Sequence, residues 1–207
     1  MKIFTIPLGP VQANCYILVK DGHGLLIDPG AVSKEVDRIL IENDVVLDAI
    51  LLTHAHFDHI GGVDYFTNKY DVNVYLNPTE FNFFKDSYLN SSQFFMEPLY
   101  CYANPIALSS GKQNIGVFEI FCSYCPGHSI GSTVFKIDNC LFTGDVIFLG
   151  SIGRTDLPTG SYTDMLMSLK KIATMDDSLK IYPGHGSSTS IHQEKIWNDT
   201  LKYVLKL

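Results

Sequence analysis

Residues 53–59 read Thr-His-Ala-His-Phe-Asp-His, and the rest of the chain can be interpreted outward from this stretch. It directly follows the apolar run 49–52 and holds four potential metal ligands within six positions: His54, His56, Asp58 and His59. Imidazoles and carboxylates at this density repel or compete unless a cation lies between them, and histidine is the commonest side-chain ligand of transition metals. The segment is too short for a helix face, so we expect a loop after a buried strand. In such a loop His54 and His56 point the same way and the next two ligands face a neighbouring point, which suits two adjacent metal ions better than one.

Three further candidate ligands each follow a predicted strand and lie in a glycine-containing turn. They are His128 in Cys-Pro-Gly-His, Asp145 in Phe-Thr-Gly-Asp and His185 in Tyr-Pro-Gly-His-Gly. Glycine lets the backbone come close to a site. Five of the seven histidines are thereby used. The other two have ordinary interpretations, because His23 lies in a predicted exposed hairpin turn and His192 in a predicted C-terminal helix.

In this order, HxHxDH, PGH, GD and PGHG resemble the motifs of the metallo-β-lactamase superfamily. Within it the chain resembles the small glyoxalase II-like (hydroxyacylglutathione hydrolase-like) hydrolases. Residues 14–18 are similar to the family's first strand, 27–30 to its aspartate-bearing turn, and 150–160 to a segment shared by the short glyoxalase II-like and persulfide dioxygenase branches. Residues from about 78 to 111 carry no family motif. The resemblance implies an α+β fold, a four-layer αββα sandwich formed by a single domain over residues 1–207.

The resemblance also implies a role for each ligand. The ligands of a first metal ion would be His54, His56 and His128, those of a second Asp58, His59 and His185, and the bridging carboxylate Asp145. Two divalent ions are therefore expected, zinc first, with iron or manganese as alternatives, because a ligand set without thiolate suits all three. Such ions can share a hydroxide that acts as the nucleophile. Asp58 is also a catalytic candidate, since it can orient the water or move its proton.

For two residues near the predicted ligands, the sequence allows either a functional or a structural role. Arg154 lies where the glyoxalase II family has a basic residue near the substrate, and it either binds substrate or forms an ion pair with Asp156. Asp28 either hydrogen-bonds a ligand loop or only helps to form its own turn, before Pro29 and Gly30. The aromatic-rich segment 81–102 has three possible roles: it forms a wall of the substrate cleft, forms a self-association surface, or packs in the core.

Local patterns predict alternating strands and helices. Strands are expected at 3–8, 16–20, 24–28, 48–53, 72–76, 117–122, 133–136, 140–143 and 180–182. Helices are expected at 33–43, 60–70, 161–173 and 190–204. Ser33 is a candidate N-cap of the first helix, because a hydroxyl oxygen can accept a hydrogen bond from a free backbone N–H. Helices that flank packed sheets satisfy the layer rule for such folds.

Composition excludes several classes of function. A net charge of −7 without a basic cluster argues against nucleic acid as the main partner. The N-terminus lacks a signal-peptide pattern, and no run approaches the ~18 apolar residues of a membrane span, so we expect a cytoplasmic protein without a membrane partner. The five cysteines have irregular spacing. Cys122 and Cys125 spell C-x-x-C, but we expect two buried strand-end thiols rather than a redox pair.

The favoured activity is hydrolysis of a small-molecule thioester such as S-lactoylglutathione to an acid and a thiol. Full-length glyoxalase II carries a C-terminal helical domain that holds much of the glutathione, and we expect that domain to be absent here, so another thioester stays open. The main alternative is a persulfide dioxygenase with one iron on His54, His128 and Asp145. Hydrolysis of a lactone or another ester would use the same metal site, and the oligomeric state is open.

Overall fold

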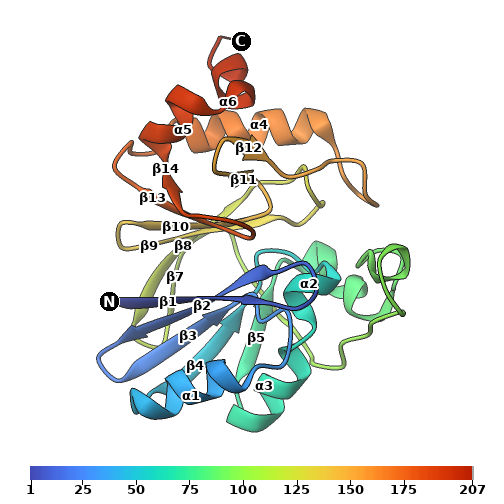
Figure 1. Ribbon diagram of the computed structural model, residues 1–207, viewed down its shortest axis with the longest axis vertical. Coiled ribbons are helices and arrows are strands. Elements are labelled where there is room, and N and C mark those ends of the chain that lie inside the picture. The colour runs from blue at the N-terminus through green and yellow to red at the C-terminus, as the bar shows by residue number, and fades with distance from the viewer. Residues whose placement is uncertain (207) are drawn as a thin grey trace.

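The computed structural model describes residues 1–206 and contains two six-stranded sheets that pack face to face, with helices on both outer faces (Figure 1). The first sheet has the order β1-β2-β3-β4-β5-β6. Its strands are β1 (Lys2–Leu8), β2 (Ala13–Lys20), β3 (His23–Ile27), β4 (Val46–Leu51), β5 (Asn73–Leu76) and β6 (Ile106–Ala107). The first three strands form an antiparallel meander, and β3 to β6 pair in parallel.

The second sheet has the order β14-β13-β10-β9-β8-β7. Its strands are β7 (Gly111–Ile115), β8 (Phe118–Tyr124), β9 (Thr133–Ile137), β10 (Cys140–Gly144), β13 (Lys180–Pro183) and β14 (Thr189–Ser190). A small separate hairpin is formed by β11 (Ile147–Phe148) and β12 (Ser151–Ile152).

Helices cover the outer face of each sheet (Figure 1). The first sheet carries α1 (Lys34–Glu42) and α3 (Val63–Tyr70), and the second carries α4 (Tyr162–Ala173), α5 (Ile191–Trp197) and α6 (Asp199–Val204). A single helical turn, α2 (Phe57–Ile60), follows the loop after β4. The predicted α+β class and αββα sandwich are thereby confirmed. None of the helices in residues 1–206 is long and apolar enough to cross a membrane.

The alternation of side chains along the strands explains why the layers form. On β2, Ile17 and Val19 pack toward the helices of the first sheet, while Tyr16 and Leu18 pack between the two sheets. Successive side chains of a strand point to opposite faces, so a strand that is apolar at every position can be buried on both sides. Phe142 of β10 stacks edge-on against Tyr16, with ring centroids 5.2 Å apart, and so joins the two sheets.

The prediction of one helix over 60–70 is wrong in detail, because α2 and α3 lie on either side of a glycine pair. A Cβ at Gly61 would lie 2.4 Å from the carbonyl oxygen of Gly30, so the backbone of the turn after β3 comes into direct contact with this point. Asp58 and His59 consequently lie on the helical turn α2, not in the loop that the sequence predicts.

The predicted C-terminal helix over 190–204 is likewise two helices, which meet at Asn198. The Asn198 side chain accepts a hydrogen bond from the backbone N–H of Leu201 at 3.1 Å and so caps α6. The predicted N-cap of α1 is confirmed, since the Ser33 hydroxyl accepts from the backbone N–H of Val36.

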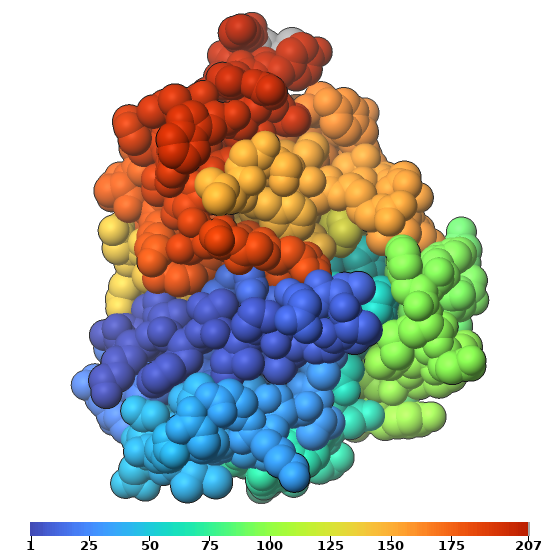
Figure 2. Space-filling view, in the orientation of Figure 1, coloured from blue at the N-terminus to red at the C-terminus, as the bar shows by residue number. Residues whose placement is uncertain are grey.

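The aromatic-rich segment divides between core and surface. It contains two 3-10 helices, η1 (Pro78–Lys85) and η2 (Ser92–Phe94). Phe83 and Phe84 are buried in the core, as the packing interpretation requires, whereas Phe94, Phe95 and Tyr102 are exposed. In the space-filling view this segment, coloured green, stands out at one side of the molecule (Figure 2).

The cysteines form no disulfide within residues 1–206. Cys122 and Cys125 are fully buried, and burial raises the pKa of each thiol to about 11. The prediction of two buried strand-end thiols is therefore confirmed.

Candidate metal centre

The predicted metal ligands lie where the chain leaves the carboxyl ends of strands in both sheets. β4 leads into the loop before α2, β8 into the turn with His128, β10 to Asp145 and β13 to His185. β8, β10 and β13 run parallel to one another, since β8 and β10 both pair antiparallel with β9 and β10 pairs parallel with β13. Their carboxyl ends therefore meet at one edge, which brings together ligands that are far apart in the sequence.

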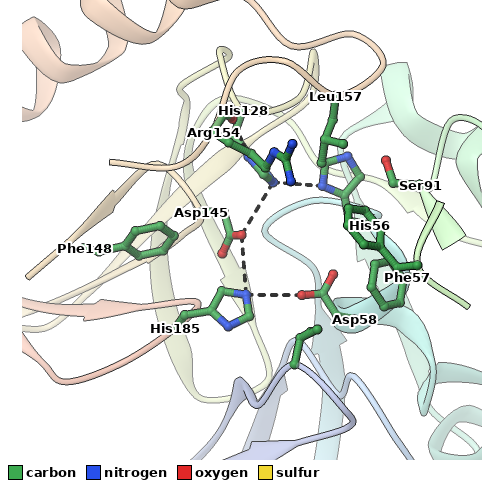
Figure 3. Close-up of a pocket in the computed structure, with 12 residues that line it drawn as sticks. His56, Phe57, Asp58, Ser91, His128, Asp145, Phe148, Arg154, Leu157 and His185 are labelled. Atoms are coloured by element: carbon green, nitrogen blue, oxygen red, sulfur yellow. Dashed lines mark hydrogen bonds and ion pairs between the residues drawn. The ribbon is translucent and has the colours of Figure 1, made fainter. Parts of the chain in front are cut away.

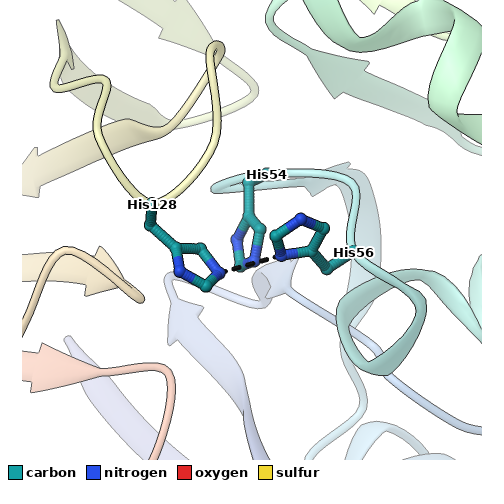
Figure 4. Close-up of side chains that lie close together, drawn as sticks. All are labelled: His54, His56 and His128. Atoms are coloured by element: carbon teal, nitrogen blue, oxygen red, sulfur yellow. Dashed lines mark hydrogen bonds between the residues drawn. The ribbon is translucent and has the colours of Figure 1, made fainter. Parts of the chain in front are cut away.

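Three buried histidines form the first group. His54, His56 and His128 each offer a ring nitrogen, and these atoms lie within 4.8 Å of one another (Figure 4). The Nδ1 of His56 is only 2.8 Å from the Nε2 of His128. At this distance either one nitrogen donates a hydrogen bond to the other, or a cation accepts both lone pairs.

The second group consists of Asp58, His59 and His185. Oδ2 of Asp58 lies 3.2 Å from Nε2 of His185 and 3.6 Å from Nε2 of His59. Ligand atoms that surround a tetrahedral ion at about 2.1 Å lie about 3.4 Å from each other. The observed separations therefore match ligands that share one ion.

The carboxylate of Asp145 lies between His128 of the first group and His185 of the second (Figure 3). Its Oδ1 is 3.5 Å from Nε2 of His59, and its Oδ2 is 3.5 Å from Nε2 of both His128 and His185. One side chain thus faces ligands of both groups, which is the position that a bridging carboxylate needs.

The residues present fit divalent cations. Within residues 1–206 six buried side-chain atoms have no hydrogen-bond partner, and four of them belong to predicted ligands: Nε2 of His54, His56 and His59, and Oδ1 of Asp145. Leaving a buried donor or acceptor unsatisfied costs about 1–3 kcal/mol, so the unpartnered atoms of His54, His59 and Asp145, which lie in one group, are costly without a bound cation.

The pKa values of histidines shift in opposite directions in the two groups. Burial, with the neighbouring imidazoles, holds the pKa of His54 well below its usual range and lowers that of His56 to about 3, so both stay neutral, as metal binding requires. Burial also lowers the pKa of His185, but hydrogen bonds to Asp145 and Asp58 outweigh it and raise the pKa to about 9. The carboxylates thus favour positive charge at the second group.

Asp28 orients two parts of the ligand segment. It is buried, and its carboxylate accepts hydrogen bonds from the backbone N–H of Thr53 at 2.8 Å, the Thr53 hydroxyl at 2.6 Å and Nδ1 of His59 at 3.0 Å. With Nδ1 of His59 donating to Asp28, Nε2 is left free to face the site. Asp28 therefore makes the contacts that the ligand-loop interpretation requires.

Arg154 contacts the site in two ways. Its backbone carbonyl accepts a hydrogen bond from Nδ1 of His128 at 2.8 Å, which leaves Nε2 of His128 facing the ligands. Its side chain donates two hydrogen bonds of 2.7 Å to the carboxylate of Asp156, and this pairing lowers the pKa of Asp156 to about 2. The ion pair with Asp156 that the sequence suggested is therefore present. Arg154 also lines the pocket, and its role in substrate binding stays a prediction.

The clustered ligands open into a pocket of about 300 Å³ (Figure 3). Five ligands line it together with Ser91, Arg154 and apolar side chains: Val11, Phe57, Phe95, Phe148 and Leu157. Phe148 lies on one side of the ligands, and Phe57 and Leu157 lie on the other (Figure 3). The pocket thus places reactive polar atoms among apolar walls, the usual character of a small-molecule site.

Sequence reasoning missed one buried carboxylate beside the ligands. Glu80 is fully buried and hydrogen-bonds the backbone N–H of Ala55, which lies between two of the histidines. The one signal in the sequence was an acidic residue next to a run of phenylalanines, which fits a surface turn equally well.

Gly184 lies so close to the ligands that a side chain there is expected to weaken metal binding. A Cβ at this position would lie 2.1 Å from Oδ1 of Asp145 and 2.9 Å from Cε1 of His59. We expect Gly184→Ala to reduce metal affinity by on the order of 10- to 100-fold, as disturbed ligand orientation commonly does. Chelator competition measures this affinity.

Gly186→Ala is the control for the same turn. A Cβ there would meet no atom within 4 Å, although the φ of +74° adds backbone strain. If the metal affinity falls equally in the two variants, disturbance of the turn, and not contact of the new Cβ with the ligands, causes the loss.

Comparisons with known proteins agree with this geometry. A family model described as the metallo-beta-lactamase superfamily matches residues 8–185. The curated relatives include a probable metallo-hydrolase of Bacillus subtilis, YqgX, which is 37% identical over 206 residues covering 97% of this chain and 98% of that protein. They also include a hydroxyacylglutathione hydrolase of Haemophilus influenzae, GloC, which is 32% identical over 208 residues covering 97% of this chain and 98% of that protein.

Two solved structures are similar over nearly their whole length. The BLEG-1 B3 metallo-beta-lactamase has a TM-score of 0.93 and 37% identity, and the match covers 97% of this chain and 99% of that one. TTHA1623 in a di-iron-bound form has a TM-score of 0.85 and 31% identity, with coverage of 95% and 98%.

Proposed function

This chain belongs to the metallo-beta-lactamase superfamily, and on that premise we propose that it is a two-metal hydrolase of thioesters, with S-lactoylglutathione as the first substrate to test. One observation carries the proposal: side chains of both ligand groups, together with Asp145, line the same apolar pocket. The relative named hydroxyacylglutathione hydrolase supports the thioester. We further propose a small-molecule substrate, without nucleic acid or membrane partner, and a cytoplasmic location.

The proposed metal is zinc, and iron is the alternative. The residues that would hold the first ion are His54, His56 and His128, those for the second Asp58, His59 and His185, with Asp145 shared. Bound ions would activate water at neutral pH and polarise the carbonyl of the substrate. The di-iron-bound form of TTHA1623 supports iron, so the metal content has to be measured on the protein itself.

The protein's own side chains supply position, proton transfer and exclusion of water. The carboxylate of Asp58 lines the pocket, and its Oδ2 is 3.2 Å from Nε2 of His185, where it can orient a water and accept its proton. Phe57, Phe95 and Phe148 provide apolar surface on which the acyl or thiol part of a substrate can pack. These walls also lower the local dielectric constant, which strengthens electrostatic interactions at the ligands.

Steady-state hydrolysis of S-lactoylglutathione by metal-loaded protein tests the proposal. We expect a kcat/KM of at least ~10⁴ M⁻¹s⁻¹, the lower end of the usual enzyme range. S-Lactoyl-N-acetylcysteamine, which keeps the acyl group and lacks glutathione, is the matched substrate control. A similar kcat/KM for both would locate recognition at the acyl part.

Two other outcomes would replace the thioester proposal. One iron per chain, with oxygen uptake on glutathione persulfide and no thioester cleavage, would assign the dioxygenase reaction. A second candidate is lactam hydrolysis, which the similarity to BLEG-1 favours, and rapid cleavage of a chromogenic cephalosporin would support it.

A further inference from the structure

Glu80, the third residue of η1, connects the two loops that carry the three-histidine group. It is 0% exposed. Its Oε2 accepts a hydrogen bond from the backbone N–H of Ala55 at 2.6 Å, and its Oε1 accepts from the backbone N–H of Gly131 at 2.8 Å and from the hydroxyl of Ser129. The first contact reaches the loop before α2, and the other two reach the turn after β8.

Two of these three contacts are made by residues next to a predicted ligand, and the third, Gly131, is three residues after His128. Ala55 is between His54 and His56 in the chain, and Ser129 directly follows His128. The two oxygens of one carboxylate therefore join the loop that carries His56 to the turn that carries His128, and the ring nitrogens of these two histidines are 2.8 Å apart.

Close packing on the far side supports this arrangement. A Cβ at Gly131 would lie 2.6 Å from Cγ of Glu80 and 2.7 Å from Oγ1 of Thr79. Within residues 1–206 Glu80 forms no ion pair with a lysine or arginine, so the three hydrogen bonds are its compensation for burial. An apolar residue would fill the same space without that cost, which indicates that the carboxylate is needed for the loops it joins.

We propose that Glu80 is a positioning residue that fixes the separation of the three-histidine group and so sets the affinity of that metal site selectively. Asp28 has the corresponding task at the other group, because it hydrogen-bonds Nδ1 of His59. Loss of Glu80 is then expected to weaken one of two metal-binding steps and to leave the other nearly unchanged. This inference rests on the proposed two-metal centre and not on the identity of the substrate.

Glu80→Gln is the principal test, because the amide keeps the size of the side chain. Its one oxygen can accept on one side only, while the NH₂ group faces an N–H donor on the other, so one loop is released. We expect one binding step for cobalt(II) to weaken by on the order of 10- to 100-fold, as for other residues that orient ligands. The visible spectrum of the cobalt(II)-loaded protein should shift with it.

Glu194→Gln is the matched control. Glu194 is also 0% exposed and accepts three hydrogen bonds, from Gly150 N–H at 2.8 Å, Thr189 Oγ1 at 2.7 Å and Asn198 Nδ2 at 3.0 Å. None of these partners adjoins a ligand of the three-histidine group. Its substitution is expected to lower the melting temperature without changing the cobalt(II) spectrum or either binding step.

The outcomes separate positioning from general destabilisation. Unchanged binding and spectrum in Glu80→Gln, or equal weakening of both steps in both variants, would overturn the proposal. Glu80→Asp restores the charge but is one methylene too short to reach both loops, so normal binding in that variant would also overturn it. If Glu80→Gln does not fold, Ser129→Ala removes one of the three hydrogen bonds, and a smaller weakening of the same step is expected.

These measurements stay separate from the test of the proposed function. Binding and spectra report on the metal centre whether or not a thioester is hydrolysed. A wild-type protein that binds two ions but cleaves no thioester would reject the substrate and leave the role of Glu80 intact.

Discussion

Asp145→Asn is expected to lower kcat/KM for hydrolysis by on the order of 10³-fold or more and to leave fewer than two metal ions per chain. The carboxylate has one oxygen 3.5 Å from His59 and the other 3.5 Å from both His128 and His185. Asparagine keeps the shape of the side chain but supplies no negative charge and only one oxygen. It can therefore face ligands of one group but not bridge the two.

Elemental analysis and steady-state kinetics of purified Asp145→Asn check this expectation together. The matched control is Asp37→Asn, since Asp37 is also a buried carboxylate. It accepts hydrogen bonds from Tyr65, Tyr70 and Lys69, none of which belongs to a ligand group. Asp37→Asn is expected to reduce stability and keep two ions per chain and the rate of hydrolysis. Normal metal content and kcat/KM in Asp145→Asn would mean that this residue does not bridge the ions.

The residues that the structure brings together in the two groups could be found in the sequence because they lie in short local patterns. His54 and His56 lie two positions apart after an apolar strand, and His128 and His185 each follow Pro-Gly. A strand end and a glycine turn largely determine where such side chains point, so the residue types alone carry the information. The layer architecture followed in the same way from strands and helices whose apolar periodicity is strong.

The contacts that hold the ligands could not be found in this way. Glu80 meets Ala55 and Gly131 only after the first and second sheets have packed, and nothing in the segment around it has a motif. The carbonyl of Arg154 that orients His128 is a backbone atom, and backbone atoms carry no sequence signal. The break between α2 and α3 depends on contact with the turn at Gly30, which is a tertiary effect that overrides the local pattern.

Removal of metal from the wild-type protein is expected to lower the free energy of unfolding by about 4 kcal/mol for each ion that was present at about 1,000 times its Kd. The structural reason is that Nε2 of His54, Nε2 of His59 and Oδ1 of Asp145 are buried and find no hydrogen-bond partner within residues 1–206. Bound ions satisfy these atoms in the folded state, whereas in the unfolded chain water satisfies them. Metal that binds to unfolded histidines would reduce the difference but leave its sign unchanged.

Urea unfolding of chelator-treated and metal-loaded protein, with metal content measured on both samples, gives this difference directly. Asp145→Asn serves as the control, because a protein that retains fewer ions has less stability to lose when the chelator is added. Glu80→Gln should be intermediate, since it is expected to weaken one binding step only. The same unfolding midpoint with and without metal, in samples shown to hold two ions and none, would mean that the buried ligands satisfy each other and that the folded state does not depend on the ions. We instead expect the loss of stability on chelator treatment to be largest in the wild type, smaller in Glu80→Gln and smallest in Asp145→Asn. This order follows if the two groups bind separate ions and share the carboxylate of Asp145.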